Sequence, residues 1–186
     1  LAFHPKHWLG ADVGGATIGI VGLGSIGLEV AKRARGFDMK VLYHSRTRNE
    51  AEEGRYNMEY VDLSTLLRDS DFVTLHVPLT PDTRGLIGEP ELRRMKSSAV
   101  LVNLARGPVV DSQALYTALR EGWIYAAGLD VTDPEPIPAG DPLLTLDNLV
   151  ITPHIGSASI TSRRTTCLLA ARNLLAGLQG KRLEGC

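Results

Sequence analysis

Three polar side chains in the second half of the sequence could act together on one small substrate. They are Arg106 in the phrase Asn-x-x-Arg-Gly, Glu135 in an acidic and proline-rich segment, and His154 in the phrase Pro-His-x-Gly. An arginine can hold an anionic group, and a histidine supported by a carboxylate can donate a proton to an oxygen near neutral pH. Together with a nicotinamide cofactor, this set predicts hydride chemistry on a 2-oxo or 2-hydroxy acid.

Each of these residues also has a simpler interpretation when it is taken alone. Arg106 could be a surface charge at a strand end, Glu135 an exposed loop carboxylate, and His154 a core histidine. Their order along the chain, behind a glycine-rich turn, favours a shared site.

That turn, Gly22-x-Gly24-x-x-Gly27, lies between an apolar run, 17–21, and a segment of helical periodicity, 25–37. In this context the first glycine allows the tight turn, the second lets the backbone approach a pyrophosphate, and the third lets helix and strand pack closely. The alternative is a turn without a ligand, because the motif by itself is weak evidence. The residues expected to contact a dinucleotide here are Gly22, Gly24, Ser25, Ile26 and Gly27.

The end of the second predicted strand bears on which nicotinamide dinucleotide binds. A carboxylate at this point usually accepts hydrogen bonds from the ribose of NAD(H). The chain has Ser45, Arg46 and Arg48 there instead; Ser45 can donate to a 2′-phosphate, and Arg46 or Arg48 can pair with it. The sequence therefore favours NADP(H), with NAD(H) as the second candidate. The alternative is that both arginines are solvated loop charges.

Short apolar runs alternate with helical segments, which predicts an α/β fold with a doubly wound parallel sheet, a Rossmann-type dinucleotide-binding domain. The runs are residues 17–21, 39–43, 59–61, 71–77, 99–104, 125–130 and 149–152, and the last four are expected to be buried on both faces. The helical segments are residues 25–37, 62–69, 90–95, 111–121, which opens with a capping Asp111, and 159–178. In such a sheet the ligand lies beyond the carboxyl ends of the strands. One crevice is therefore expected to gather the residues at those ends: Gly22, Ser45, Val77, Arg106, Asp130 and His154.

Length and composition fit one globular domain, with 186 residues, 44% of them hydrophobic, and a net charge of -1. This balance offers no field for nucleic acid or an anionic membrane, so neither is expected as a partner. Cys167 and Cys186 lack metal-ligand spacing, and no metal site is expected. Neither a membrane span nor a leader is evident, so a cytoplasmic protein is expected. We divide the chain into a remnant of an interdomain segment (1–15), a dinucleotide-binding domain (16–180) and a tail (181–186).

Four phrases, 77–83, 103–107, 130–136 and 153–156, stand in a fixed order behind the glycine-rich turn. With them the chain resembles the D-2-hydroxyacid dehydrogenases from about residue 12 to residue 180, and most closely the members that reduce glyoxylate and hydroxypyruvate. The resemblance implies that Arg106 binds the substrate's carboxylate and carbonyl oxygen. It implies that His154 is the general acid in reduction and the base in the reverse direction, that Glu135 supports His154, and that Asp130 orients the nicotinamide carboxamide. The cofactor contacts implied in this part of the chain are Val77, Pro78, Thr83, Leu104, Ala105, Arg106, Asp130, His154 and Gly156.

The resemblance also implies a separate substrate domain, most of which this chain lacks, so the chain alone is expected to have weak activity or none. It implies a small 2-oxo or 2-hydroxy acid as substrate and a homodimer formed through the cofactor domain, with part of an apolar face from the helix 111–123. His76 is expected to pack near the cofactor. Two alternatives stay open: a non-catalytic module similar to the C-terminal-binding-protein corepressors, and another family member that acts on phosphoglycerate or formate. The basic strand end argues against both.

Overall fold

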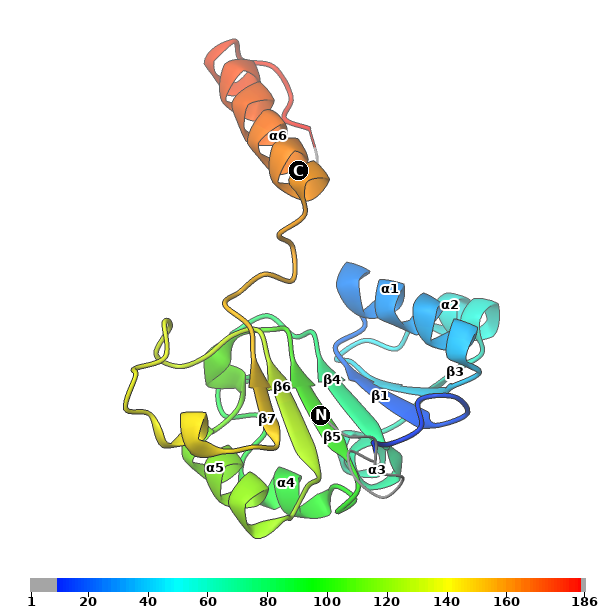
Figure 1. Cartoon of the computed structure of the whole chain (residues 1–186). Coiled ribbons are helices and arrows are strands. Elements are labelled where there is room, and N and C mark those ends of the chain that lie inside the picture. Colours follow the sequence, from blue (N-terminus) through cyan, green and yellow to red (C-terminus); the bar gives the residue numbers. More distant parts are fainter. Residues whose placement is uncertain (1–9, 185–186) are drawn as a thin grey trace, which may run out of the picture. The chain divides into compact units, whose positions relative to one another are not determined.

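A parallel sheet of seven strands, in the order β3-β2-β1-β4-β5-β6-β7, organises the first part of the chain (Figure 1). The computed structural model describes residues 10–184, and the chain divides after Thr152 into two units. The first unit contains the whole sheet. The second unit starts at Pro153 and contains helix α6 (Ile160–Leu178), whose first turn is capped by the Ser159 side chain.

Strands and helices alternate along the first unit, and every pair of neighbouring strands is parallel. The strands are β1 (Thr17–Val21), β2 (Lys40–His44), β3 (Met58–Tyr60), β4 (Phe72–Leu75), β5 (Val100–Asn103), β6 (Ala126–Leu129) and β7 (Leu149–Ile151). The α-helices are α1 (Ser25–Ala34), α2 (Glu50–Tyr56), α3 (Leu63–Asp69), α4 (Glu89–Arg94) and α5 (Ser112–Glu121), and short 3-10 helices cover Arg35–Phe37, Gly107–Val109 and Pro142–Thr145. The predicted doubly wound parallel sheet is confirmed.

The direction of sheet growth reverses between β1 and β4. The chain builds outward from β1 through β2 to β3, and then returns so that β4 pairs with the other side of β1. From β4 it builds in the opposite direction to β7. The connections that leave β1 and β4 therefore diverge, which opens a crevice at the carboxyl ends of these two strands.

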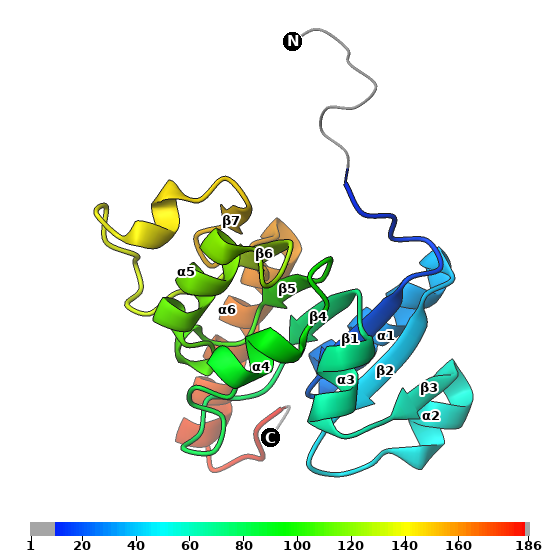
Figure 2. The same cartoon turned by 90° about the horizontal axis from the view of Figure 1, so that it is seen from below.

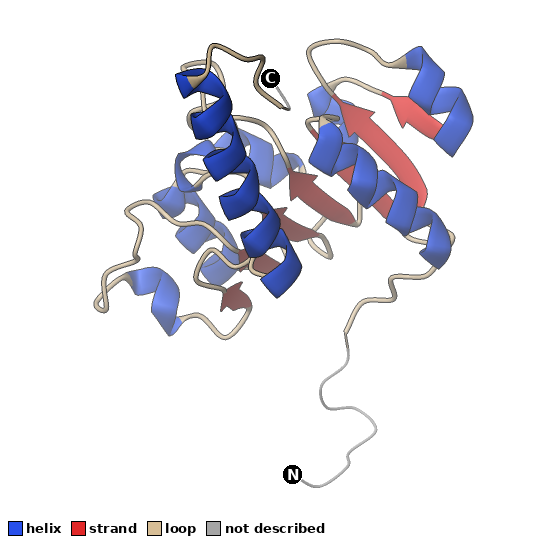
Figure 3. Cartoon of the chain, turned by 90° about the horizontal axis from the view of Figure 1, so that it is seen from above, coloured by secondary structure: helices blue, strands red, loops and turns tan. Residues whose placement is uncertain are grey.

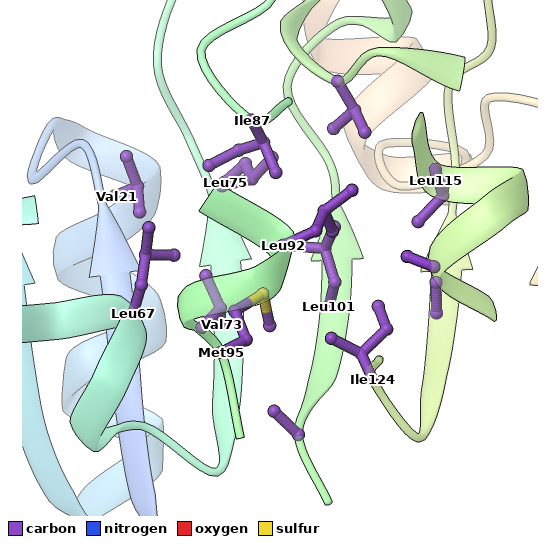
Figure 4. Close-up of a cluster of buried hydrophobic side chains, with 14 of the residues drawn as sticks. Val21, Leu67, Val73, Leu75, Ile87, Leu92, Met95, Leu101, Leu115 and Ile124 are labelled. Atoms are coloured by element: carbon purple, nitrogen blue, oxygen red, sulfur yellow. The ribbon is translucent and has the colours of Figure 1, made fainter. Parts of the chain in front are cut away.

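Side chains along the strands alternate between two hydrophobic clusters. In β1, Ile20 belongs to the cluster that contains Ala31 and Ala34 of α1, whereas Val21 belongs to the larger cluster that contains Leu66 of α3. Figures 2 and 3 show the corresponding layers, with α1 and α2 on one face of the sheet and α3, α4 and α5 on the other. Figure 4 shows the larger cluster, where side chains from the strands meet those of these three helices.

Helix α2 was not predicted from the sequence. Its seven residues, EAEEGRY, carry no apolar periodicity. The available signals were at its start, where Asn49 accepts a hydrogen bond from the Glu52 amide and three glutamates occupy the first turn. Such residues stabilise a helix N-terminus by capping it and by interacting with its dipole.

One expectation about a surface stays a prediction and a second needs correction. An apolar dimer face formed partly by the helix 111–123 is predicted; Leu115, Ala118 and Leu119 of this helix are buried in the larger cluster of the first unit, so other side chains would have to form that face. The homodimer stays a prediction without an assigned surface. In β7, Val150 was expected to be buried, but the first unit leaves it 67% exposed, because β7 is the edge strand and α1 and α2 lie over the opposite end of the sheet.

Part of the predicted domain division lies outside the described residues, namely 1–9 of the segment 1–15 and 185–186 of the tail, with Cys186. Within residues 10–184, the structure contains no helix with the length and apolar character needed to cross a membrane.

Asp71 joins the amino ends of three strands. Its carboxylate accepts hydrogen bonds from the Thr17 amide at 2.9 Å and from Lys96 Nζ at 2.7 Å, and its backbone pairs with Thr17 and Val100. The Lys96 ammonium, and after it the Thr17 amide, hold the pKa of Asp71 below its usual value. The ionised carboxyl is thus the form that stabilises the fold. Its contribution is complete above the unfolded-state pKa of about 4 and is lost as the pH falls through the lower pKa of the folded state.

Asp71→Asn should lower the free energy of unfolding by about 1 kcal/mol at neutral pH, because charge-assisted hydrogen bonds are lost from a partly exposed site. Urea unfolding at about pH 7 and about pH 3 measures this, and the difference from the unchanged protein should shrink at the lower pH. Asp147→Asn, at an exposed aspartate, is the matched control. Equal midpoints for the two variants at neutral pH would refute the role of Asp71.

Candidate functional site

A cavity of about 340 Å³ lies beyond the carboxyl ends of β1, β2 and β4, where the sheet order reverses. Its walls come from the glycine-rich turn, the segment after β2 and the segment after β4. The residues that line it are Val21, Gly22, Leu23, Gly24, His44, Ser45, Arg46, His76, Val77, Pro78, Thr80, Asp82, Thr83 and Leu86. Of the residues expected from the sequence to contact the cofactor, Gly22, Gly24, Ser45, Arg46, Val77, Pro78 and Thr83 thus share one cavity.

The amino end of α1 faces solvent without a side-chain cap. Its N-cap is Gly24, which has no side chain to offer, and the first turn contains no acidic residue. By contrast, Asp111 caps α5, as predicted, by accepting from the amides of Gln113 and Ala114. Uncapped amides at the positive end of a helix dipole are suited to bind an anion such as a pyrophosphate.

Close backbone packing explains why glycine occupies the first and last positions of the turn. Gly22 has φ +98°, and a Cβ there would lie 2.9 Å from the backbone of His76 and Val77. A Cβ on Gly27 would collide with the carbonyl oxygen of Gly22. A Cβ on Gly24, however, would meet no protein atom within 4 Å. Since Gly24 lines the cavity, this open space lies where the sequence predicts that a dinucleotide approaches the helix amides.

The segment after β2 distinguishes the two arginines that the sequence offered for a 2′-phosphate. Ser45 and Arg46 line the cavity. Arg48 does not line it, and its guanidinium makes a two-point ion pair with Glu53, with Arg48 Nη2 2.8 Å from Glu53 Oε2. The guanidinium of Arg48 holds the pKa of Glu53 below its usual range, with a smaller contribution from the Tyr43 hydroxyl. Arg46 is therefore the arginine available to a ligand in this cavity.

The segment after β4 is held in shape by Thr83. Its hydroxyl donates to the Pro78 carbonyl at 2.6 Å and accepts from the Thr80 amide at 2.8 Å. These hydrogen bonds position the cavity wall, and Thr83 also lines the cavity. His76 also lines the cavity, where its Nε2 lies 2.9 Å from Thr74 Oγ1 and burial lowers its pKa, which favours a neutral ring. Its expected position near the cofactor site agrees with this placement.

The sequence did not identify Leu23, His44, Thr80, Asp82 and Leu86 as cavity residues. The signal for Leu23 and His44 was their position, since each stands within two residues of the end of β1 or β2. For the residues after β4, no local pattern marks which side chains of an irregular segment face the cavity.

Several expected cofactor contacts do not line this cavity. Ser25 and Ile26 are the first two residues of α1, and Ile26 is 63% exposed. Gly27 faces the Gly22 carbonyl instead. Leu104 is exposed and Ala105 is buried, both in the turn that follows β5.

The turn that carries Arg106 is held by hydrogen bonds from a buried side chain. The buried Asn103 side chain donates from Nδ2 to the Arg106 carbonyl at 2.9 Å and accepts the Ala105 amide at 3.0 Å. Arg106 itself is exposed, and its Nη1 donates to the Ala105 carbonyl at 2.6 Å. A Cβ on Gly107 would collide with the backbone of Thr132. The Arg106 turn therefore packs directly against the start of the segment that carries Glu135.

The remaining predicted residues are divided between the two units. Asp130 is 7% exposed at the end of β6, and its carboxylate accepts a hydrogen bond from the Thr152 hydroxyl at 2.6 Å. Glu135 lies in the exposed loop that follows. His154 and Gly156 belong to the second unit, and His154 has a left-handed backbone with φ +54°.

The expectation that one crevice gathers all strand-end residues is thus met in part. Gly22, Ser45 and Val77 share the cavity, whereas Arg106 and Asp130 do not line it. The topology explains the difference, because the cavity is formed at β1 and its two neighbours, β2 and β4, whereas β5 and β6 are separated from β1 by β4. The meeting of His154 with Glu135 stays a prediction.

Comparison with known proteins identifies the family. The sequence model of the D-isomer specific 2-hydroxyacid dehydrogenase, NAD binding domain, matches residues 2–156. The chain belongs to this family. This family model describes an NAD binding domain, and the cavity at the reversal, with the uncapped α1 and the open space at Gly24, is the candidate site for such a dinucleotide.

The relatives of the dehydrogenase domain include glyoxylate reductases. Glyoxylate reductase of Pyrococcus horikoshii is 55% identical over 181 residues, which are 97% of this chain and 54% of that protein. Glyoxylate/hydroxypyruvate reductase B of Salmonella newport is 51% identical over 180 residues, which are 96% of this chain and 56% of that protein. The crystal structure of a Thermus thermophilus protein matches with a TM-score of 0.93 at 49% identity, covering 99% of this chain and 57% of that one. The chain spans about half the length of the curated relatives it matches.

Gly24→Ala tests the cavity in the dehydrogenase domain. The added methyl group meets no protein atom within 4 Å but obstructs the approach of the pyrophosphate, so affinity for NADH and NADPH should fall by about tenfold or more while urea unfolding still shows a folded protein. Titration of intrinsic fluorescence measures the affinities. Gly36→Ala, which also has open space around the new Cβ, should leave both affinities unchanged. Full binding by Gly24→Ala would show that the dinucleotide lies elsewhere.

Proposed function

We propose that the whole protein reduces small 2-oxo acids, namely glyoxylate and hydroxypyruvate, to the corresponding 2-hydroxy acids with NADP(H). The observation that carries this proposal is the likeness to glyoxylate reductases over nearly the whole chain. Since those proteins are about twice as long, we expect their remaining half to be needed to enclose the substrate. This chain alone should then bind the cofactor and turn over substrate slowly or not at all.

Arg106 is proposed to bind the substrate's carboxylate and to polarise its carbonyl. Its guanidinium has five N–H donors, and the internal bond to the Ala105 carbonyl leaves most of them for an anion. The two hydrogen bonds of Asn103 fix the backbone from which this side chain leaves. A fixed base reduces the entropy lost when the substrate is held in one orientation.

His154 is proposed to donate the proton to the oxygen of the reacting carbon, and Glu135 to stabilise its imidazolium form. A carboxylate partner favours the charged form of a histidine and fixes its orientation. The left-handed backbone of His154 supports a functional role, because such strain in a residue other than glycine costs on the order of 1 kcal/mol and concentrates at functional sites. When bound, the cofactor supplies the hydride for the same carbon.

The preference for NADP(H) is proposed from Ser45 and Arg46. Both line the cavity at the end of β2, where an NAD-preferring domain usually carries a carboxylate. The Ser45 hydroxyl can donate to a 2′-phosphate, and the Arg46 guanidinium can pair with it.

In the full-length protein, His154→Ala should lower kcat by about 100- to 10,000-fold, which is the usual contribution of general acid catalysis. Arg106→Ala should raise KM for glyoxylate and lower kcat, because it removes both substrate binding and carbonyl polarisation. Affinity for NADPH should change little in either variant. Steady-state rates with glyoxylate and hydroxypyruvate, beside Arg164→Ala as a control, provide the measurement. Near-normal rates in both variants would contradict the assigned roles.

Arg46→Ala should weaken NADPH binding by about tenfold or more and leave NADH binding unchanged, because only NADPH carries the 2′-phosphate. Arg35→Ala, at an exposed arginine after α1, controls for the loss of one positive charge. Equal affinity of the unchanged protein for the two dinucleotides would remove the proposed preference.

A further inference from the structure

The turn 45–49 between β2 and α2 carries the two residues to which the NADP(H) preference is assigned. Ser45 follows directly on β2, and Asn49 is the N-cap of α2. Ser45 and Arg46 line the cavity. Whatever sets the conformation of this turn therefore sets how Arg46 is presented to a ligand.

The Tyr43 hydroxyl forms a hydrogen bond with Asn49, the last residue of the turn. Tyr43 lies on β2 and is fully buried. Its hydroxyl accepts the Asn49 amide at 2.8 Å and donates to Glu53 Oε1 at 2.5 Å. Because Asn49 also accepts the Glu52 amide, one buried hydroxyl joins the sheet, the end of the turn and the start of α2.

Glu53 connects the same hydroxyl to Arg48. The Glu53 side chain is 12% exposed and binds Arg48 through both carboxylate oxygens, with Arg48 Nε 2.9 Å from Oε1 and Nη2 2.8 Å from Oε2. Burial, and then Glu53, raises the pKa of Tyr43 to about 12, so at neutral pH the phenol remains the donor. Arg48 is thereby held at α2, and Arg46 remains as the arginine of the turn that faces the cavity.

A second tyrosine, Tyr60, forms a hydrogen bond with Ser45, the first residue of the turn. Tyr60 on β3 donates its hydroxyl to the Ser45 carbonyl at 3.3 Å, and its ring lies edge-on to that of Tyr43 with centroids 5.3 Å apart. The Arg48 guanidinium lies 5.9 Å from the Tyr60 ring. Both ends of the turn are thus tied to tyrosines of neighbouring strands.

We propose that Tyr43 is a positioning residue for cofactor discrimination, whose hydroxyl, with Glu53 and Arg48, holds the turn 45–49 so that Arg46 meets the 2′-phosphate of NADP(H). This inference rests on the proposed NADP(H) preference. The turn touches the part of the ligand in which the two dinucleotides differ. Loss of the hydroxyl should therefore affect NADPH and spare NADH.

Tyr43→Phe is the decisive variant, because it keeps the buried ring and changes no charge. In the full-length protein, its Kd for NADPH should rise about fivefold, the equivalent of one hydrogen bond, while its Kd for NADH stays within about twofold. Fluorescence titration with each dinucleotide gives the ratio of the two constants, and NADH binding also reports that the variant is folded. Tyr56→Phe, at a half-buried tyrosine of α2, is the matched control and should leave the ratio unchanged.

Glu53→Gln is the second variant. It keeps an oxygen for the Tyr43 hydroxyl but loses the charge that holds Arg48, and the ratio should move in the same direction. An unchanged ratio in Tyr43→Phe, equal weakening of both dinucleotides, or tighter NADPH binding by Glu53→Gln would overturn the proposal. If Arg46→Ala still abolishes the preference, the proposed function stands and only the role of Tyr43 fails. If the unchanged protein shows no preference, the proposed NADP(H) specificity itself fails.

Discussion

The backbones of three segments meet at the glycine-rich turn with no room for a side chain. A Cβ on Gly27 would collide with the Gly22 carbonyl, and one on Gly22 would press on the backbone of His76 and Val77. The end of β1, the first turn of α1 and the segment after β4 are therefore held at one spacing. This tight spacing places the amino end of α1 beside the candidate cofactor cavity, and any larger residue would push α1 away from the sheet edge.

The segment after β2 contributes a positive charge, that of Arg46, to the lining of the cavity. Arg46 and Arg48 are close together in the sequence after β2, but they make different contacts in the structure. Arg48 neutralises Glu53 beside the start of α2, and Arg46 remains at the cavity. The acidic first turn of α2, which stabilises that helix, is in this way partly neutralised by Arg48.

Much of this fold could be predicted because local signals and tertiary structure agree. The run 17–21 and the glycines behind it define β1 and the start of α1, and Asp111 marks the start of α5. Helix α2 escaped prediction because it has no apolar stripe and depends on contacts such as that between Glu53 and Tyr43. For the same reason, the sequence could not decide between Arg46 and Arg48.

The limits of prediction for the candidate site have a topological cause. A strand-end position can be recognised from the sequence, but its distance from β1 depends on the order of the strands. Gly22, Ser45 and Val77 follow β1 and its two neighbours, β2 and β4, whereas Arg106 and Asp130 follow β5 and β6 beyond β4. Both groups of residues follow an apolar run in the sequence, so the sequence does not distinguish them, although they lie at different strands of the sheet.

The contact between Gly107 and the Thr132 backbone links two loops that are far apart in the sequence. Because the two backbones are in direct contact at that point, an insertion or deletion beside it in one loop would have to be matched by a change of backbone position in the other loop. Homologues should accordingly vary in length at the exposed far end of the proline-rich segment and keep the residues between β5 and Gly107 at constant number. Protein engineers who exchange substrate specificity in this family would do well to transfer the two loops as one piece.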